Sequence, residues 1–228
     1  MHVCAIDLPG ALAGTKGANI SLHPCDLTDA DAVARTCADI IAARPSIDLV
    51  VHNAGVTQIA PFAEADQAAH RRLMEVNYFA PVAMAHAFLH PLRAAKGAHL
   101  ALSSVAGFAP LIGRTSYAAS KHALSGFFGS LRAEEAPFGV QVTIAAPSFV
   151  ATNPDAAEGG AGLARPGSAR DGIDPMTPDA AVAEILRALD AGRDFAPVGR
   201  VARISWLLHR LSPRLYARAM IRSVRKRG

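Results

Sequence analysis

The chain has 228 residues, of which 51% are hydrophobic and 18% charged, so it can bury a sizeable core and is too apolar to be disordered. Its formal net charge of +4 comes from the C-terminal end, because residues 200–228 hold nine basic and no acidic side chains, while the first 199 residues hold 14 basic and 19 acidic ones. The basic balance therefore gives no reason to expect a nucleic-acid-binding body. The three cysteines, Cys4, Cys25 and Cys37, form no CxxC pair, which argues against a disulfide framework or a zinc site and fits a reducing compartment.

No segment of the sequence predicts a membrane-spanning helix. The longest stretch without a formal charge, Ala136–Pro154, is interrupted by Pro137, Gly139 and Pro147, which break a spanning helix. Met1–Gly10 lacks the basic start of a signal peptide, so none is expected. We expect a cytoplasmic protein, with membrane association left open by the basic C-terminal segment.

Short apolar runs alternate with longer helical patterns along the chain. The runs are mostly apolar throughout, which is typical of parallel strands covered on both faces. The predicted strands are His2–Asp7, Ile20–Cys25, Ile47–His52, His99–Ser103, Val140–Ala145 and Phe195–Val198.

Helical patterns fill the intervals between these runs. Thr28 is a candidate N-cap for a helix through Pro45, and Thr177-Pro178-Asp179 is a helix start signal. Alternation of strand and helix predicts βαβ units, hence an α/β fold with a doubly wound parallel sheet. The other predicted helices are Glu64–Ala95, bent at Pro81, and Ser116–Ala136, and Asn153–Pro175 is predicted to be a mobile loop.

Three residues form a pattern suited to proton transfer. Tyr117 and Lys121 are four apart, which places them on one face of a helix, and a lysine ammonium beside a tyrosine favours the phenolate and lowers its pKa. Ser104 follows a predicted strand, where a hydroxyl can hold a substrate oxygen. Together they suit acid–base chemistry on an alcohol or a carbonyl.

Tyrosine and lysine at this spacing are common on exposed helices, so the pair alone is weak evidence. The context strengthens it, because Asp26-Leu27-Thr28-Asp29, Asn53-Ala54-Gly55 and Ser103-Ser104 all follow strands. Ligands of open α/β sheets bind at the carboxyl ends of the strands.

With these motifs the sequence resembles the short-chain dehydrogenase/reductase family from about Val3 to about Val198. The resemblance implies a Rossmann-like fold and hydride transfer between a nicotinamide cofactor and a secondary alcohol or ketone. By this resemblance Tyr117 is the general acid/base, Lys121 lowers its pKa and binds the nicotinamide ribose, Ser104 orients the substrate oxygen, and Asn77 completes a tetrad through a bound water.

The same resemblance implies the cofactor-binding residues. Asn53-Ala54-Gly55 is similar to the family's NAG element, and Asp26 with Leu27 to its adenine-contacting pair. Pro147–Thr152 resembles a PGxxxT segment that embraces the nicotinamide, although Ser148 stands where the family usually has glycine. The implied set is completed by Asp7, Tyr117, Lys121, Pro147, Val150 and Thr152.

The family's first strand and its glycine-rich phosphate turn have no counterpart here. Met1 begins at what resembles the second strand, and Gly10, Gly14 and Gly17 are not expected to form that turn, because only 16 residues separate Gly10 from Asp26. The sheet would lack a central member. Three explanations compete: a start assigned too late, which we favour, a fragment, or a sheet rearranged so that the family's second strand pairs with its fourth.

Asp7 favours NAD over NADP. A carboxylate at the end of the strand that resembles the family's second one accepts hydrogen bonds from the ribose hydroxyls of the adenosine and repels a 2′-phosphate. The alternative is that Asp7 only opens the Asp-Leu-Pro-Gly turn.

His86 and His90 are four apart, but no third ligand accompanies them, so no metal site is expected.

Val201–Val224 has apolar residues at helical spacing with arginines between them, split by Pro213. We expect residues 1–199 to form one domain and residues 200–228 a basic amphipathic extension. This extension caps the substrate loop or a partner subunit, or contacts a membrane surface. The absence of an aromatic platform argues against nucleic acid.

The sequence thus predicts an NAD(P)-dependent oxidoreductase acting on a secondary alcohol or ketone, with a hydrophobic substrate suggested by the apolar C-terminal elements. The resemblance implies a homodimer or homotetramer formed through Glu64–Ala95 and Ser116–Ala136. The alternative is a non-catalytic protein that keeps the fold for binding or oligomerisation and has lost the cofactor turn.

Overall fold

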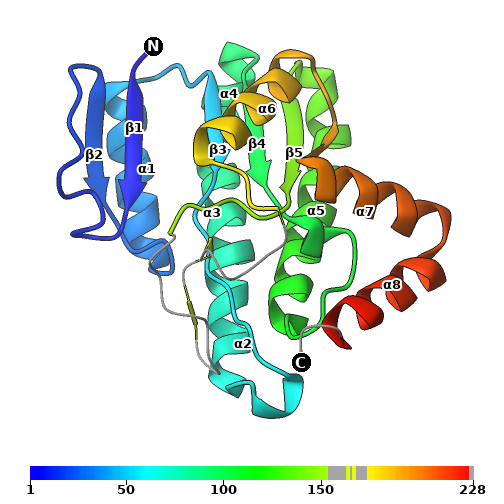
Figure 1. The fold of residues 1–228 in the computed structure, drawn as a ribbon. Helices are drawn as coiled ribbons and strands as arrows, with labels where there is room; N and C mark the ends of the chain where they lie inside the picture. The colour runs from blue at the N-terminus through cyan, green and yellow to red at the C-terminus, as the bar shows by residue number, and fades with distance from the viewer. Residues whose placement is uncertain (154–162, 165, 168–173, 226–228) are drawn as a thin grey trace.

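The computed structural model describes residues 1–153, 163–164, 166–167 and 174–225 (Figure 1). It is a layered α/β structure in which parallel strands are covered by helices on both faces. The strands are β1 (Val3–Asp7), β2 (Ile20–Pro24), β3 (Leu49–His52), β4 (Ala98–Leu102), β5 (Gln141–Pro147) and β6 (Phe195–Val198). The helices are α1 (Ala30–Ala43), α2 (Gln67–Met74), α3 (Ala80–Ala87), α4 (Leu89–Ala95), α5 (Thr115–Glu135), α6 (Pro178–Asp190), α7 (Arg200–Leu211) and α8 (Pro213–Arg225), with short turns η1 (Phe62–Glu64), η2 (Glu75–Phe79), η3 (Val105–Gly107) and η4 (Ala136–Phe138).

Two faces of the central strands pack against different helices. Val142 and Ile144 of β5 belong to a buried cluster with Phe128 of α5. Their neighbour Ala145 packs instead with Ile185 of α6. Because side chains alternate between the two faces of a strand, an apolar run such as β5 buries both faces. The parallel sheet predicted from these runs is confirmed.

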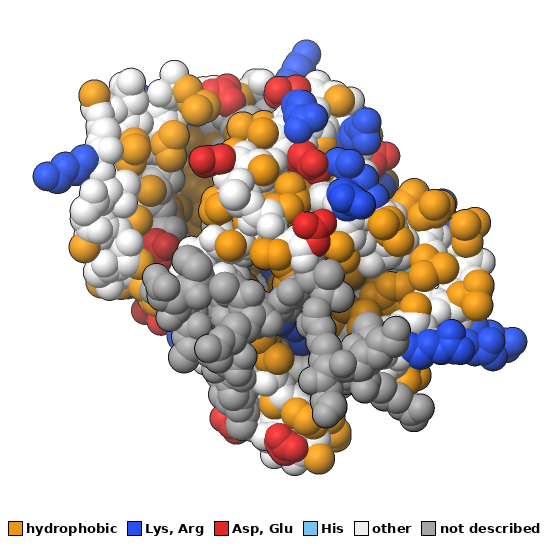
Figure 2. All heavy atoms as spheres, in the orientation of Figure 1, with side chains coloured by type: hydrophobic (Ala, Val, Ile, Leu, Met, Phe, Trp, Pro, Cys, Tyr) orange, Lys and Arg blue, Asp and Glu red, His pale blue; other side chains and the backbone are white. Residues whose placement is uncertain are grey.

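The strands form two sheets and not one continuous sheet. β1 pairs with β2 in parallel, and β3-β4-β5-β6 form a separate parallel sheet in that order. The described strands therefore leave a gap between β1 and β3. The rearranged sheet considered above is not formed, since β1 and β3 do not pair. A groove lies between β1 and β3, while α1 packs against α3 beneath it, and Figure 2 shows this hollow on the left of the surface.

The β1–β2 connection contains the three glycines of the sequence GALAGTKG. Gly10 and Gly14 have φ of +89° and +86°, which only glycine adopts without strain. They form tight turns, with the N–H of Ala13 donating to the carbonyl of Gly10. No helix follows them before β2, so these glycines do not form a strand–turn–helix phosphate site, as expected.

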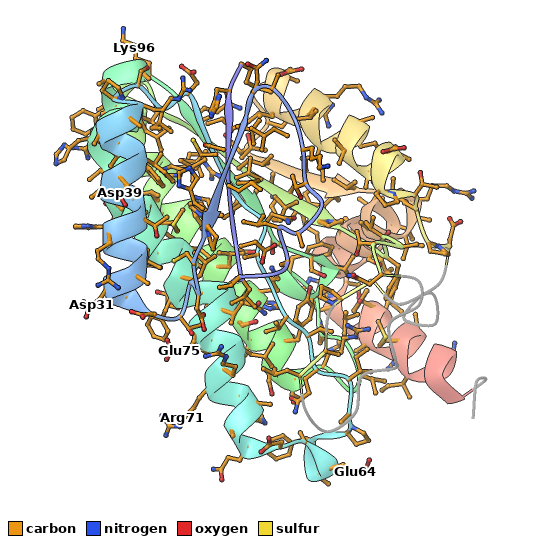
Figure 3. The ribbon with its side chains drawn as sticks, turned by 90° about the vertical axis from the view of Figure 1, so that its left-hand side faces the viewer. Asp31, Asp39, Glu64, Arg71, Glu75 and Lys96 are labelled. Atoms are coloured by element: carbon orange, nitrogen blue, oxygen red, sulfur yellow. The ribbon has the colours of Figure 1, made fainter. Side chains whose placement is uncertain are left out.

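The helix starts are partly as predicted. The expected cap Thr177 is confirmed, since its hydroxyl accepts from the N–H of Ala180 at 3.3 Å. The expected cap Thr28 is wrong: its hydroxyl donates to Asp26 at 2.7 Å, and Asp29 caps α1 by accepting from Ala32. In Figure 3 the labelled charged residues of α1 and α2, including Asp31 and Arg71, lie on the outer side of these helices.

The predicted long helix Glu64–Ala95 is subdivided in the structure. Asp66 caps α2, because its carboxylate accepts from the N–H of Ala68. The turn η2 is π-helical, and the chain leaves helical geometry at Phe88, between α3 and α4. The π-helical turn ends at Phe79, two residues before Pro81, and the backbone stays helical between them.

The C-terminal segment forms two helices that meet at Pro213, as predicted. Ala202 of α7 and Tyr216 of α8 are buried with Val105 and Ala109, near η3. The extension therefore packs beside the segment that follows β4. Among the described residues, no helix is long and apolar enough to cross a bilayer. Most of the predicted mobile loop, Asn153–Pro175, lies outside the described residues.

Candidate active site

Tyr117 and Lys121 lie on the inner face of α5. Both side chains are buried, with 8% and 5% of their surface exposed. The Nζ of Lys121 lies 6.0 Å from the centroid of the Tyr117 ring and donates to the carbonyl of Leu102 at 2.7 Å. Burial lowers the pKa of Lys121 to about 8, because a low-dielectric environment disfavours the charged form. The predicted pair is therefore brought together in a water-poor environment.

Asn77 ties the segment after β3 to α5. Its Oδ1 accepts from the N–H of Val56, and its Nδ2 donates to the carbonyl of Val56 and to the hydroxyl of Ser120, each at 2.9 Å. The hydroxyl of Ser120 in turn donates to the carbonyl of Tyr117 at 2.9 Å. Asn77 is fully buried within the π-helical turn, a geometry often found at functional sites.

Gly55 lies between these groups. A Cβ at this position would lie 3.3 Å from the Oδ1 of Asn77 and 3.6 Å from the Nζ of Lys121. The absence of a side chain therefore lets the Asn53-Ala54-Gly55 segment approach both predicted tetrad residues closely.

Ser104 caps the turn η3, and its hydroxyl accepts from the N–H of Ala106 at 3.2 Å. The turn is tightly packed on α5. A Cβ on Gly107 would meet the hydroxyl of Ser103 and would lie 2.9 Å from the carbonyl of Lys121. Glycine is thus required for η3 to lie against the helix that carries Tyr117, and this contact brings Ser104 to the same region.

The remaining predicted dinucleotide residues follow β1, β2 and β3. Asp7, Leu27, Asn53 and Ala54 line one cavity of about 460 Å³ between β1 and β3. The carboxylate of Asp7 is exposed and accepts from the N–H of Leu8 at 2.7 Å, so it also holds the turn considered as the alternative.

Asp26 has a different environment. Its carboxylate accepts from the N–H and the hydroxyl of Thr28, and Arg72 lies 3.5 Å away. These hydrogen bonds, followed by the charge of Arg72, lower the pKa of Asp26. The carboxylate therefore stays ionised and anchored to the start of α1.

Pro147 ends β5, and Val150 and Thr152 follow it, where the chain is held by β6 and by the residues before α6. Val150 forms a bridge with Met176, and Thr152 donates to the carbonyl of Pro166 at 3.3 Å. Ser148 does not have positive φ, so the departure from glycine causes no backbone strain.

Sequence patterns missed a polar group beside Tyr117. The hydroxyl of Ser116 donates to Gln58 at 3.1 Å and lies 2.8 Å from the Nδ1 of His70. Arg114 donates to Thr57 at 3.0 Å, with its guanidinium 5.8 Å from the Tyr117 ring centroid. Only the position of Ser116 and Arg114, one and three residues before Tyr117 in the sequence, could have indicated them.

The profile of the family described as short chain dehydrogenase matches residues 8–159. The chain belongs to the short-chain dehydrogenase family. This result confirms the family predicted from the tetrad motifs, and the match spans most of the strands and all four tetrad residues.

Named relatives agree with this assignment. The chain is 31% identical over 205 residues to the Xenopus laevis protein named dehydrogenase/reductase SDR family member 7B, covering 89% of this chain and 64% of that one. The Bos taurus protein of the same name is 35% identical over 153 residues, covering 64% and 47%. The chain thus spans about half to two thirds of the length of these curated relatives.

Solved structures show the same fold. A short chain dehydrogenase from Burkholderia cenocepacia, in complex with NADP, superposes with a TM-score of 0.83 at 26% identity, covering 96% of this chain and 86% of that one. A short-chain dehydrogenase from Streptomyces avermitilis gives 0.80 at 25% identity, covering 100% and 90%. The Rossmann-type α/β fold predicted from the sequence is confirmed.

The family's nicotinamide dinucleotide fits the described residues at its two ends only. Asp7 and Leu27 border the cavity at one end, and the buried ammonium of Lys121 suits a ribose at the other. Between them, the described residues offer no glycine-rich turn leading into a helix N-terminus, the usual pyrophosphate site. The adenosine and nicotinamide ends fit, whereas the pyrophosphate does not.

Proposed function

We propose that this protein is an NAD(P)-dependent oxidoreductase that interconverts a secondary alcohol and a ketone, with Tyr117 as general acid/base. The observation that carries the proposal is that the buried Lys121 ammonium lies 6.0 Å from the centroid of the buried Tyr117 ring, on a helix to which Asn77 is linked through Ser120. Membership of the short-chain dehydrogenase family supports the reaction class.

The proposed roles combine the family resemblance with this geometry. Near neutral pH most of Lys121 is protonated, since its pKa is about 8, and its positive charge stabilises a phenolate on Tyr117. Tyr117 then exchanges a proton with the substrate oxygen at its phenolic Oη. The Ser104 hydroxyl orients that oxygen, and Asn77 holds the loop and α5 in register and supports a proton relay. A bound nicotinamide would supply or accept the hydride.

Two observations bear on the cofactor in different directions. Asp7 at the end of β1 favours NAD, because its carboxylate would repel a 2′-phosphate. The similar Burkholderia cenocepacia structure carries NADP. We propose NAD as the preferred cofactor of this chain. The residues proposed to bind it, besides Tyr117 and Lys121, are Asp7, Asp26, Leu27, Asn53, Ala54, Gly55, Pro147, Val150 and Thr152.

The C-terminal extension suggests where the substrate comes from. On α7, Ile204, Leu207 and Leu211 share one face and are 63%, 54% and 76% exposed. Figure 2 shows hydrophobic side chains gathered over the α7–α8 side, with Lys and Arg at its margins. An apolar face flanked by arginines is typical of helices that lie on anionic lipid. We propose that this face contacts a membrane surface and that the substrate is hydrophobic.

Assembly is a further part of the proposal. α2, α3 and α5 carry the segments through which the family resemblance implies pairing, and Phe79, next to α3, is 50% exposed. We propose a homodimer or homotetramer formed through these helices.

A second candidate function rests on the split sheet. If the chain never acquires a pyrophosphate site, it keeps the fold for binding or oligomerisation without catalysis. Calorimetric titration of the folded chain with NADH, and with NADPH as control, separates the two candidates. Binding of NADH supports the enzyme, whereas absence of binding by either nucleotide supports the non-catalytic protein.

The catalytic assignment is tested with Tyr117→Phe, with Tyr78→Phe as the matched control. Removing the hydroxyl of Tyr117 should abolish oxidation of NADH by ketone substrates, while nucleotide affinity stays nearly unchanged. Tyr78→Phe should retain activity. Appreciable turnover by Tyr117→Phe would show that another group transfers the proton.

A further inference from the structure

Arg114 precedes α5, and its side chain is held beside the candidate active site. It occupies the N-cap position of α5 but makes no side-chain capping hydrogen bond there. Its Nη1 donates instead to the hydroxyl of Thr57 at 3.0 Å. Thr57 is fully buried in the segment that follows β3, 57 residues away in the chain. The guanidinium is therefore anchored across two segments that are distant in the sequence.

The anchored guanidinium lies near two aromatic rings. Its Cζ is 5.8 Å from the centroid of the Tyr117 ring and 6.0 Å from the centroid of the Phe149 ring. A cation within about 6 Å of a ring centroid is attracted to the electrons of the ring. Phe149 belongs to the segment after β5, so these contacts place Arg114 where α5 and that segment meet.

Tyr117 therefore has two cations near its ring. Among the described residues, these are Lys121, whose Nζ lies 6.0 Å from the ring centroid, and Arg114. The two cations respond differently to pH. Burial lowers the pKa of Lys121 to about 8, so its positive charge is lost as pH rises above that value. A guanidinium keeps its charge over the whole pH range in which proteins stay folded.

The other elements packed against Tyr117 direct their charged groups elsewhere. The ring packs on α2 and η3, and η3 contains no titratable side chain. On α2, His70 lies 2.8 Å from a serine hydroxyl, Arg71 is on the outer side of the helix in Figure 3, and Arg72 pairs with a carboxylate at 3.5 Å. The described surroundings of the ring are therefore net positive.

We propose that Arg114 is a positioning residue that shares with Lys121 the stabilisation of the Tyr117 phenolate. The inference rests on the proposed function, in which Tyr117 gives its phenolic proton to a ketone oxygen or takes a proton from an alcohol. Arg114 neither donates nor accepts that proton. Its positive charge lowers the free energy of the phenolate left on Oη, and it continues to do so at pH values at which Lys121 is neutral.

The size of the effect follows from the distance. A unit charge about 6 Å away, in an effective dielectric constant of about 20, shifts a pKa by about two units. Arg114 is half-buried, so solvent screens part of this interaction. We expect that removing the guanidinium charge raises the pKa of Tyr117 by about one unit.

The test follows the ultraviolet absorbance of tyrosinate in the folded chain as pH is raised, and it needs neither cofactor nor substrate. The chain has three tyrosines, so the signal of Tyr117 is the difference between each protein and the same protein carrying Tyr117→Phe. Arg114→Gln should raise the pKa of Tyr117 by about one unit. Arg114→Lys, which keeps a positive charge, should shift it by less than half as much. Circular dichroism defines the pH range in which each protein is folded.

Arg71→Gln is the matched control, because Arg71 is exposed on the outer side of α2 and the change in net charge is the same. It should leave the titration of Tyr117 unchanged. An unchanged titration in Arg114→Gln, an equal shift in Arg71→Gln, or a full shift in Arg114→Lys would overturn the inference. If Arg114→Gln does not fold, Arg114→Met, which keeps an apolar stem against the two rings, is titrated in its place with the same expected shift.

The result is separable from that of the proposed function. A shifted titration together with appreciable turnover by Tyr117→Phe would refute Tyr117 as the acid/base but support the charge interaction of Arg114 with its phenolate. An unshifted titration together with an inactive Tyr117→Phe would refute the role of Arg114 and leave the proposed function standing.

Discussion

Replacing Lys121 with methionine should change how the stability of the protein depends on pH. Burial lowers the pKa of Lys121 from 10.5 to about 8, and the difference corresponds to about 3 kcal/mol by which folding disfavours the ammonium. Below about pH 8 the lysine is protonated in both states, so the whole penalty is present. As pH rises from about 8 towards 10.5, the unfolded state binds more protons and the free energy of unfolding rises.

The expected slope for this one group is about 1.4 kcal/mol per pH unit within that window. Cys37 acts in the opposite direction, because burial raises its pKa from 9.0 to about 11, so its folded state keeps a proton longer and loses stability as pH rises above 9. Comparing the unchanged chain with Lys121→Met removes the Cys37 contribution, which both proteins share.

The assay is urea unfolding at several pH values between about 7 and 9, followed by circular dichroism. Lys121→Met should lack the rise in stability, so the free energy of unfolding of the unchanged chain, minus that of Lys121→Met, should be about 1 kcal/mol greater at about pH 9 than at about pH 8. Lys16→Met, which removes an exposed loop lysine, should follow the unchanged chain. Parallel curves for Lys121→Met and the unchanged chain would refute a buried ammonium, and with it the stability cost that we attribute to this group.

Two further changes test the packing of η3 and the C-terminal surface. Gly107→Ala forces a Cβ to within 2.9 Å of the Lys121 carbonyl and should lower the free energy of unfolding, measured by chemical denaturation, by about 1–3 kcal/mol. In the control Gly126→Ala, on the same helix as Lys121, the added Cβ meets nothing within 4 Å. This control should not destabilise the protein. Leu211→Glu should reduce cosedimentation with phosphatidylglycerol vesicles at least several-fold, while Val182→Glu should not; equal binding by both would refute the α7 surface as the lipid contact.

The placement of Tyr117 and Lys121 on one helix face was predictable from the sequence. The spacing of Tyr117 and Lys121 is local, so a helical pattern was enough to place both on one face, and the strand Phe195–Val198 is confirmed at both ends. The three hydrogen bonds of Asn77 could not be predicted, because they join segments 21 and 43 residues apart.

The errors have similar physical causes. Thr28 and Asp29 are both good N-caps, and the choice was decided by Asp26, which engages the Thr28 hydroxyl. The contact of Ser116 with His70 spans 46 residues and has no periodic signal. The gap between β1 and β3 was expected, because the sequence has no counterpart to the family's first strand.

The π-helical turn at Glu75–Phe79 has an evolutionary consequence. Such a turn accommodates one residue more than an α-helical turn, and here it contains Asn77, the amide that joins the loop after β3 to α5. Deleting one codon between Met74 and Ala80 would restore regular α-helical spacing and leave the helices on both sides in about their present orientation, but it would remove the widened turn that holds Asn77. The inward direction of Asn77 is therefore linked to the exact length of this helix, so reading-frame-preserving deletions here should be lost from active descendants even where each remaining residue is individually tolerated.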